Sequence, residues 1–137
     1  MRLLCYDGLR MNRSRDWLRQ AEDDFLWAED TLAAERWAQA CFVAQQCAEK
    51  ALKAVALARG FDRVKSHSIL DIARALGING EIEKAAKRLD LYYMTARYPD
   101  ALPAGAPLDY FTSEQAEEAV ALAGLVLKRA RAEMPAP

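Results

Sequence analysis

The single histidine of this 137-residue chain, His67, lies in a basic segment whose residues could bind an anion. Arg63 and Lys65 precede it, and Ser66 and Ser68 flank it. Either serine could cap a helix that begins here, and the first N–H groups of a helix have no acceptor within the helix. A phosphate at that helix start would meet those N–H groups, the two cations and an imidazole that can become charged near neutral pH. The alternative is a histidine that only hydrogen-bonds the backbone beside a helix start.

A second candidate site is a polar stripe in a segment that is otherwise rich in alanine. Its members, spaced i, i+3, i+4 and i+7, are Gln46, Glu49, Lys50 and Lys53. Glu49 and Lys53 form a favourably oriented helical pair, which contributes only ~0.3 kcal/mol when it is exposed to solvent. A solvated face is the plain alternative, but the small neighbouring side chains indicate a central helix with little solvent around it. On such a helix we expect a charged stripe to line a cleft or an interface.

A third candidate is the segment 97-RYPD-100, which follows a predicted helix. Arg97 and Tyr98 together could pair with and stack on a nucleotide or a carboxylate, and Pro99 restricts the backbone where the chain leaves the helix. The alternative is packing alone, with Tyr98 buried against the other helices and Arg97 bridging to an acidic side chain.

Composition and missing motifs exclude several other classes of protein. A hydrophobic content of 53% indicates a folded globular domain, and a formal net charge of -1 provides no overall basic field for nucleic acid. One histidine, with no Cys-x-x-Cys and no His-Glu-x-x-His sequence, leaves no zinc site, and we predict no metal and no cofactor. A P-loop nucleotidase and a serine hydrolase are not supported either, because their glycine-containing motifs are missing.

The three cysteines, Cys5, Cys41 and Cys47, are odd in number and are typical of small core residues in a reducing cytosol. No stretch of the sequence is long and apolar enough for a signal peptide or a membrane span. We therefore expect a cytoplasmic protein without a membrane association.

The three- and four-residue spacing of apolar side chains predicts five helices, which must position the candidate residues. The expected ranges are 14–34, 36–59, about 66 or 68 to 76, 80–94 and 112–132. The pattern fails over 95–111, which contains three prolines, and a loop of this length more often has a function than none. We predict an all-α, antiparallel up-and-down helical bundle of about five helices, with one long loop before the last helix.

The first ten residues do not join this helical pattern. We therefore divide the chain into an N-terminal extension, 1–10, which a misassigned translation start before Met11 would explain, and a bundle, 11–137. Three tryptophans, Trp17, Trp27 and Trp37, could supply a homodimer interface, and burial in the core of one chain is the alternative.

Four segments resemble the HEPN (higher eukaryotes and prokaryotes nucleotide-binding) domain family and occur in its order. They are 16-DWLRQAEDDFLWAEDTL-32, 42-FVAQQCAEKALKAVALARG-60, 65-KSHSILDIARAL-76 and 96-ARYPDA-101. The resemblance implies an all-α bundle that dimerises and that is often encoded beside a minimal nucleotidyltransferase, with which it forms a two-component, toxin–antitoxin-like module. It also implies that its signature positions are Glu49, Lys50, Lys53, His67 and the 97–100 segment, which coincide with the three candidates above.

Ribonucleases of that family carry an Arg-x(4–6)-His motif, from which this sequence departs. Arg63 precedes His67 by three intervening residues and Arg59 precedes it by seven, and no later histidine follows. Cleavage of RNA by general acid–base catalysis needs an ionisable group at the scissile phosphate, and His67 is the one histidine available. The resemblance is therefore to a member of the non-ribonuclease type.

The sequence as a whole predicts a small, noncatalytic HEPN module that forms a homodimer, binds a nucleotide or another phosphate ligand, and partners a minimal nucleotidyltransferase. Lys65, Ser66, His67, Arg63 and Arg97 would bind the anion, Tyr98 would stack, and the stripe with Glu49, Lys50 and Lys53 would line the same cleft. One alternative is a metal-independent ribonuclease toxin that uses His67 and Arg63. The other is a protein-interaction adaptor, and RNA is a possible but less favoured ligand.

Overall fold

The computed structural model describes residues 13–61 and 64–136, and every regular element within them is a helix. The elements are α1 (Ser14–Ala33), α2 (Trp37–Ala58), α3 (Ile69–Ala75), α4 (Glu81–Asp90), α5 (Tyr92–Thr95), the 3-10 turns η2 (Pro99–Ala101) and η3 (Pro107–Asp109), and α6 (Ser113–Glu133). The predicted N-terminal extension, 1–10, lies outside the described residues.

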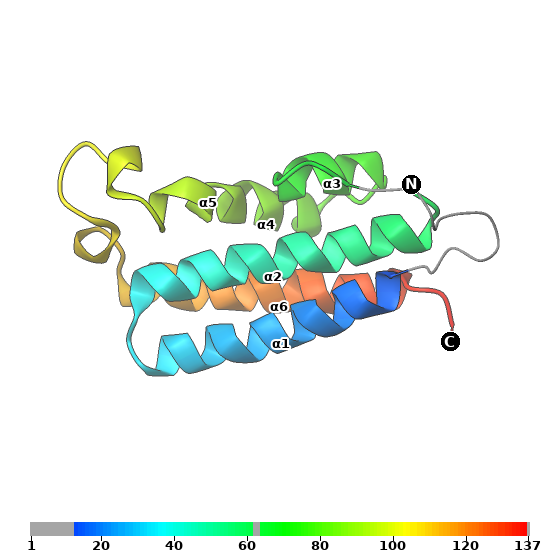
Figure 1. Ribbon diagram of the computed structural model, residues 1–137, viewed down its shortest axis with the longest axis horizontal. Helices are drawn as coiled ribbons and strands as arrows, with labels where there is room; N and C mark the ends of the chain where they lie inside the picture. Colours follow the sequence, from blue (N-terminus) through cyan, green and yellow to red (C-terminus); the bar gives the residue numbers. More distant parts are fainter. Residues whose placement is uncertain (1–12, 62–63, 137) are drawn as a thin grey trace, which may run out of the picture.

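The three long helices, α1, α2 and α6, lie side by side; α2 and α6 run in the same direction and α1 runs in the opposite one (Figure 1). The short helices α3, α4 and α5 follow one another along the opposite side of α2, so that α4 and α5 together form the fourth leg of the bundle (Figure 1). The long loop, with its two 3-10 turns, connects this leg to α6 at one end of the molecule. The prediction of an all-α, up-and-down bundle is confirmed.

Helix α2 contacts the other helices on both sides because most of its buried side chains are small. Its buried residues include seven alanines and two cysteines: Ala38, Ala40, Cys41, Ala44, Cys47, Ala48, Ala51, Ala54 and Ala56. Side chains of this size let the neighbouring helix axes approach closely, so the tight packing of the core removes α2 from solvent. As a result, any polar side chain that points inward from α2 has to find its partners within the protein.

Cys41 and Cys47 are free, buried members of this core, as expected from the sequence. Burial raises the pKa of each thiol to about 12, with nearby acidic side chains adding to the effect, Glu118 at Cys41 and Asp24 at Cys47. Neither thiol is therefore a nucleophile at neutral pH, because the thiolate is the reactive form.

The continuous helix predicted over 80–94 is divided in the structure. The backbone N–H of Leu91 donates to the carbonyl of Arg88, three residues back, which tightens the chain and separates α4 from α5. The last helix begins with a capping box, in which Thr112 N donates to Gln115 Oε1 (2.9 Å) and Gln115 N donates to Thr112 Oγ1 (3.3 Å).

Among the described residues, no helix combines the length and the apolar content that a membrane span requires.

The packing of α2 predicts that an enlarged side chain at a buried alanine destabilises the bundle. Ala51→Leu, at a fully buried position of α2, should lower the free energy of unfolding by about 1–3 kcal/mol, because the core has no room for the extra methylene groups. Urea denaturation followed by circular dichroism measures this change. The matched control is Ala121→Leu, on the exposed face of α6, where we expect a change within about 0.5 kcal/mol. Equal losses of stability in the two variants would show that Ala51 is not more closely packed than Ala121.

Candidate functional site

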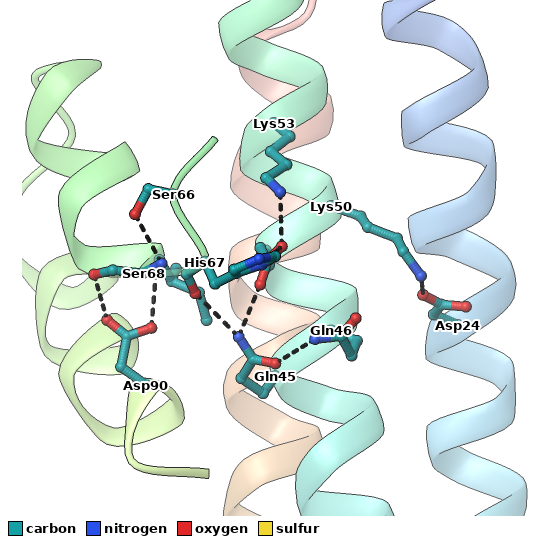
Figure 2. Close-up of polar contacts among 11 residues, drawn as sticks. Asp24, Gln45, Gln46, Lys50, Lys53, Ser66, His67, Ser68 and Asp90 are labelled. Carbon is teal, nitrogen blue, oxygen red and sulfur yellow. Dashed lines mark hydrogen bonds and ion pairs between the residues drawn. The ribbon is translucent and has the colours of Figure 1, made fainter. Parts of the chain in front are cut away.

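The Glu49 carboxylate is buried where the segment before α3 meets α2, and it contacts three polar side chains. Gln45 Nε2 donates to Oε1 (3.1 Å), Lys53 Nζ donates to Oε2 (2.8 Å), and Nδ1 of His67 lies 3.2 Å from Oε2. Gln45 and Lys53 are one helical turn before and after Glu49, while His67 comes from the segment that precedes α3. Figure 2 shows Lys53 and His67 meeting at this point of α2. We call these four residues the Glu49 cluster.

This cluster compensates a charge that would otherwise be costly to bury. Glu49 is 4% exposed and Lys53 is 7% exposed, so neither ionised group is hydrated as it would be at the surface. The Lys53 ammonium also lies 5.6 Å from the centre of the Trp17 ring, a cation–π contact. Each buried side-chain nitrogen and oxygen atom in the described part of the chain has a hydrogen-bond partner, so the cluster is complete without a ligand.

His67 is fixed in three ways, although its side chain is 56% exposed. Its Nδ1 contacts Glu49, and its backbone carbonyl accepts a hydrogen bond from Gln45 Nε2 (3.4 Å). Its ring stacks on Tyr93, with the ring centres 4.9 Å apart and the planes inclined by 16°. The imidazole thus has a defined orientation and no described partner at Nε2.

Arg97 also contacts Tyr93, and its guanidinium lies among three aromatic rings. The guanidinium carbon is 4.7 Å from the ring centre of Phe42, 4.9 Å from that of Tyr93 and 4.6 Å from that of Tyr98. No described residue accepts a hydrogen bond from this guanidinium or forms an ion pair with it. The rings orient the cation through cation–π contacts and leave its N–H groups free for an anion.

A partly open pocket of about 260 Å³ lies beside Arg97. Besides Arg97, its lining residues are Ala38, Gln39, Phe42, Ala96, Pro107 and Leu108, so the walls are mainly apolar. Ligand pockets for whole drug-sized molecules usually range from about 300 to 1,000 Å³, so this one would accommodate one apolar or planar part of a ligand. We call it the Arg97 pocket.

The start of α3 is occupied by an internal carboxylate. Asp90, the last residue of α4, accepts hydrogen bonds from Ile69 N (2.7 Å), Leu70 N (3.1 Å) and Ser68 Oγ (3.0 Å). Ser68 is the N-cap, since its Oγ also accepts from the backbone N–H of Asp71 (3.1 Å). These are the donors that the sequence offered to a phosphate, so a ligand anion at this helix start would have to displace Asp90.

The remaining candidate residues have different surroundings from those expected. Ser66 Oγ accepts from the backbone N–H of Ser68 (3.0 Å), and Lys65 is exposed. Lys50 Nζ donates to Asp24 of α1 (2.6 Å), so it points away from His67 (Figure 2). Successive helical residues are about 100° apart, which places Lys50 on the α1 side and Glu49 on the α3 side of the same helix. Arg63 lies outside the described residues.

The structure therefore connects the basic segment around His67 with the 97–100 segment through Tyr93, a residue that is not among the three candidates. Tyr93 contacts both His67 and Arg97, and it precedes Arg97 by four residues. Gln45 likewise precedes Glu49 by four residues, so helical spacing could have indicated both. The sequence could have indicated Asp90 in a different way. A carboxylate at the C-terminal end of a helix is unfavourable unless hydrogen-bond donors or cations from elsewhere bind it.

Comparisons with known proteins agree with the fold. The family model described as "HEPN domain" matches residues 14–133. The crystal structure of TT1696 from Thermus thermophilus is 43% identical, with a TM-score of 0.85 over 90% of this chain and 100% of that one. The structure of ST0689, described as an archaeal HEPN homologue, is 34% identical, with a TM-score of 0.79 over 91% and 100% of the two chains. A protein of Methanocaldococcus jannaschii named "Putative toxin MJ1304" is 26% identical over 88% of each chain.

The contacts of Asp90 predict that its carboxylate stabilises the pair of helices α3 and α4. Asp90→Ala leaves two backbone N–H groups and the Ser68 hydroxyl without this acceptor, and we expect a loss of about 2 kcal/mol in the free energy of unfolding. Urea denaturation gives the value. Asp71→Ala, which removes an exposed carboxylate from the first turn of α3, is the control and should cost about 0.5 kcal/mol. A loss at Asp90 no larger than at Asp71 would show that the carboxylate does not cap α3.

Proposed function

The chain belongs to the HEPN domain family. We propose that it is a noncatalytic member that binds a phosphate-bearing ligand, such as a nucleotide, and that it acts in a two-component, toxin–antitoxin-like pair. Its similarity to a protein named as a toxin supports the pair. The observation that carries the ligand is the Arg97 guanidinium. Its faces are covered by Phe42, Tyr93 and Tyr98, and its N–H groups have no acceptor among the described residues.

The chemistry of the surrounding groups favours a phosphate ester over a free anion. Arginine matches the geometry of phosphate and carboxylate oxygens with two parallel hydrogen bonds. The Arg97 pocket beside it has apolar walls that would accommodate a base or a sugar, and the exposed ring of Tyr98 offers a stacking surface. Lys65 and the free Nε2 of His67 would contact the remaining polar groups of the ligand. Lys53 would act on the ligand only indirectly, because its ammonium is bound to Glu49.

The supply of ionisable groups supports a noncatalytic role. Each chain carries one histidine, and Arg63 is too close to it in sequence for the ribonuclease motif. General acid–base cleavage of RNA needs proton transfer at both the attacking and the leaving oxygen. A ribonuclease that uses His67 is nevertheless the second candidate, because a carboxylate on Nδ1 is the arrangement that orients a histidine base.

Binding of adenosine monophosphate (AMP) tests the ligand proposal. Isothermal titration should show binding to the wild-type protein, and Arg97→Ala should weaken it roughly tenfold or more, because it removes charge-assisted hydrogen bonds to the phosphate. Arg19→Ala, an exposed arginine of α1, is the matched control and should leave the affinity unchanged.

The result that contradicts this proposal is the absence of heat with AMP, ATP and inorganic phosphate at millimolar concentrations. The same preparation should leave a labelled single-stranded RNA intact. Cleavage that His67→Ala abolishes would favour the ribonuclease instead.

Two apolar surfaces are available for the partners, a second copy of the chain and a minimal nucleotidyltransferase. The first is formed by exposed side chains of the α4–α5 junction, α5 and the long loop: Leu91, Met94, Tyr98, Leu108 and Tyr110. The second consists of Leu26 and Trp27 on α1, each more than half exposed. Of the three tryptophans suggested for an interface, Trp17 and Trp37 pack partly buried against the core, which leaves Trp27.

Charge assigns each surface to one of these partners. Acidic residues adjoin Leu26 and Trp27 on α1, namely Asp23, Glu29 and Asp30. Two copies of this acidic surface would repel each other, so it fits a partner with basic side chains, and we assign it to the nucleotidyltransferase. The surface around Leu108 has both signs of charge nearby, with Arg97, Asp100 and Asp109, and it can therefore pair with its own copy.

Two single substitutions separate these contacts. Leu108→Asp should convert the proposed homodimer into a monomer in light scattering, because it places a charge on a side chain that is 78% exposed in one chain and that would be buried in this dimer. Leu26→Asp should leave the dimer intact but remove the nucleotidyltransferase of the neighbouring gene from a co-purified complex. A wild-type protein that is monomeric, or that retains its transferase in both variants, would contradict the assignment.

A further inference from the structure

The hydrogen bond between Glu49 and His67 determines which nitrogen of the imidazole carries the proton. Lys53 Nζ donates to Oε2 at 2.8 Å in an ion pair, and a carboxylate can only accept hydrogen bonds. Since Nδ1 of His67 lies 3.2 Å from the same oxygen, Nδ1 has to be the donor. In the neutral imidazole Nε2 then has no proton and presents a lone pair.

We propose that Glu49 is the positioning residue of the ligand site: it fixes the tautomer and the ring orientation of His67, so that Nε2 accepts a hydrogen bond from a hydroxyl or N–H group of the ligand. The inference rests on the proposed function, in which His67 contacts that ligand. Gln45 supports the arrangement, because its amide nitrogen contacts both Glu49 Oε1 (3.1 Å) and the backbone carbonyl of His67 (3.4 Å).

The position of Tyr93 specifies the ligand further. Its ring lies 4.9 Å from the imidazole and 4.9 Å from the guanidinium carbon of Arg97, so the hydrogen-bond acceptor on His67 and the donors on Arg97 belong to side chains that contact the same ring. A ligand that uses both groups needs a phosphate for the Arg97 guanidinium and a hydrogen-bond donor for Nε2 of His67. The ligand class is therefore a phosphate ester whose organic part carries a hydroxyl or amino group, with the phosphate at Arg97 and that group at His67.

A second, largely buried ion pair on α2 gives a matched comparison. Lys50 and Asp24 join α2 to α1 at 2.6 Å, and neither of them contacts an imidazole. Replacement of a buried ion pair by apolar side chains of similar volume is often tolerated. The double variants Glu49→Met/Lys53→Met and Asp24→Met/Lys50→Met thus remove one such pair each, and the first alone removes the acceptor of His67.

Nitrogen NMR of the imidazole tests the inference, and the single histidine makes the signal unambiguous. At alkaline pH, where the ring is neutral, the wild-type protein and Asp24→Met/Lys50→Met should carry the proton on Nδ1. In Glu49→Met/Lys53→Met it should redistribute toward Nε2. Glu49→Asp keeps the charge but has a shorter side chain that does not reach His67, so it should show the same redistribution. This variant replaces the double variant if the latter does not fold.

Ligand titration completes the test. Against the Asp24→Met/Lys50→Met control, loss of the Glu49 acceptor should weaken AMP binding roughly fivefold, the effect of one misplaced hydrogen bond, and leave the weaker binding of inorganic phosphate unchanged. A wild-type proton on Nε2, or an unchanged tautomer in both Glu49 variants, overturns the inference. If AMP does not bind the wild-type protein, both the proposed function and the assigned ligand class are wrong. The NMR spectrum by itself still decides whether Glu49 fixes the tautomer of His67.

Discussion

A carboxylate buried in the middle of the bundle sets the conditions that the surrounding side chains have to meet. Glu49 projects from a helix whose buried residues are mostly alanine and cysteine, so it gives up its hydration on folding and depends on polar side chains nearby. Its two oxygens are satisfied by an amide, an ammonium and an imidazole. Two of these donors come from the same helix, one turn away on either side, and the third can arrive only when the segment before α3 packs against α2. The position of His67 is thus a consequence of how one charge is buried.

The small side chains of α2 are what create this condition. Because helices approach α2 from both sides, its polar residues are divided between two interfaces. Lys50 meets Asp24 on the α1 side, whereas Glu49 meets His67 of the segment before α3, and Lys53 lies between Glu49 and Trp17 of α1. Had α2 been a surface helix, Gln46, Glu49, Lys50 and Lys53 would form a solvated stripe whose ion pairs contribute little to stability. Core packing and site geometry are therefore two aspects of the same arrangement, and neither could change alone.

Much of this organisation could be predicted from the sequence, because it depends on local spacing. Periodic apolar residues predict the helices, and the Thr112 to Gln115 pattern predicts the start of the last one. The resemblance to the family implied that the Glu49, His67 and Arg97 segments matter. Spacing did not reveal the break at Leu91, which depends on one tightened turn, or the role of Asp90, whose partners lie 20 to 22 residues away. The aromatic surroundings of Arg97 were missed for the same reason, since they combine side chains from α2, α5 and the long loop.

The ring of Tyr93 makes the two parts of the site energetically dependent on each other. It stacks on His67 and also contacts the Arg97 guanidinium, so a change in either neighbour alters the surface that the other one packs against. Residues that share a partner in this way do not contribute independent, additive free energies. The binding energy of the site is then a property of the three side chains together, and only a thermodynamic cycle that includes Tyr93 can divide it among them.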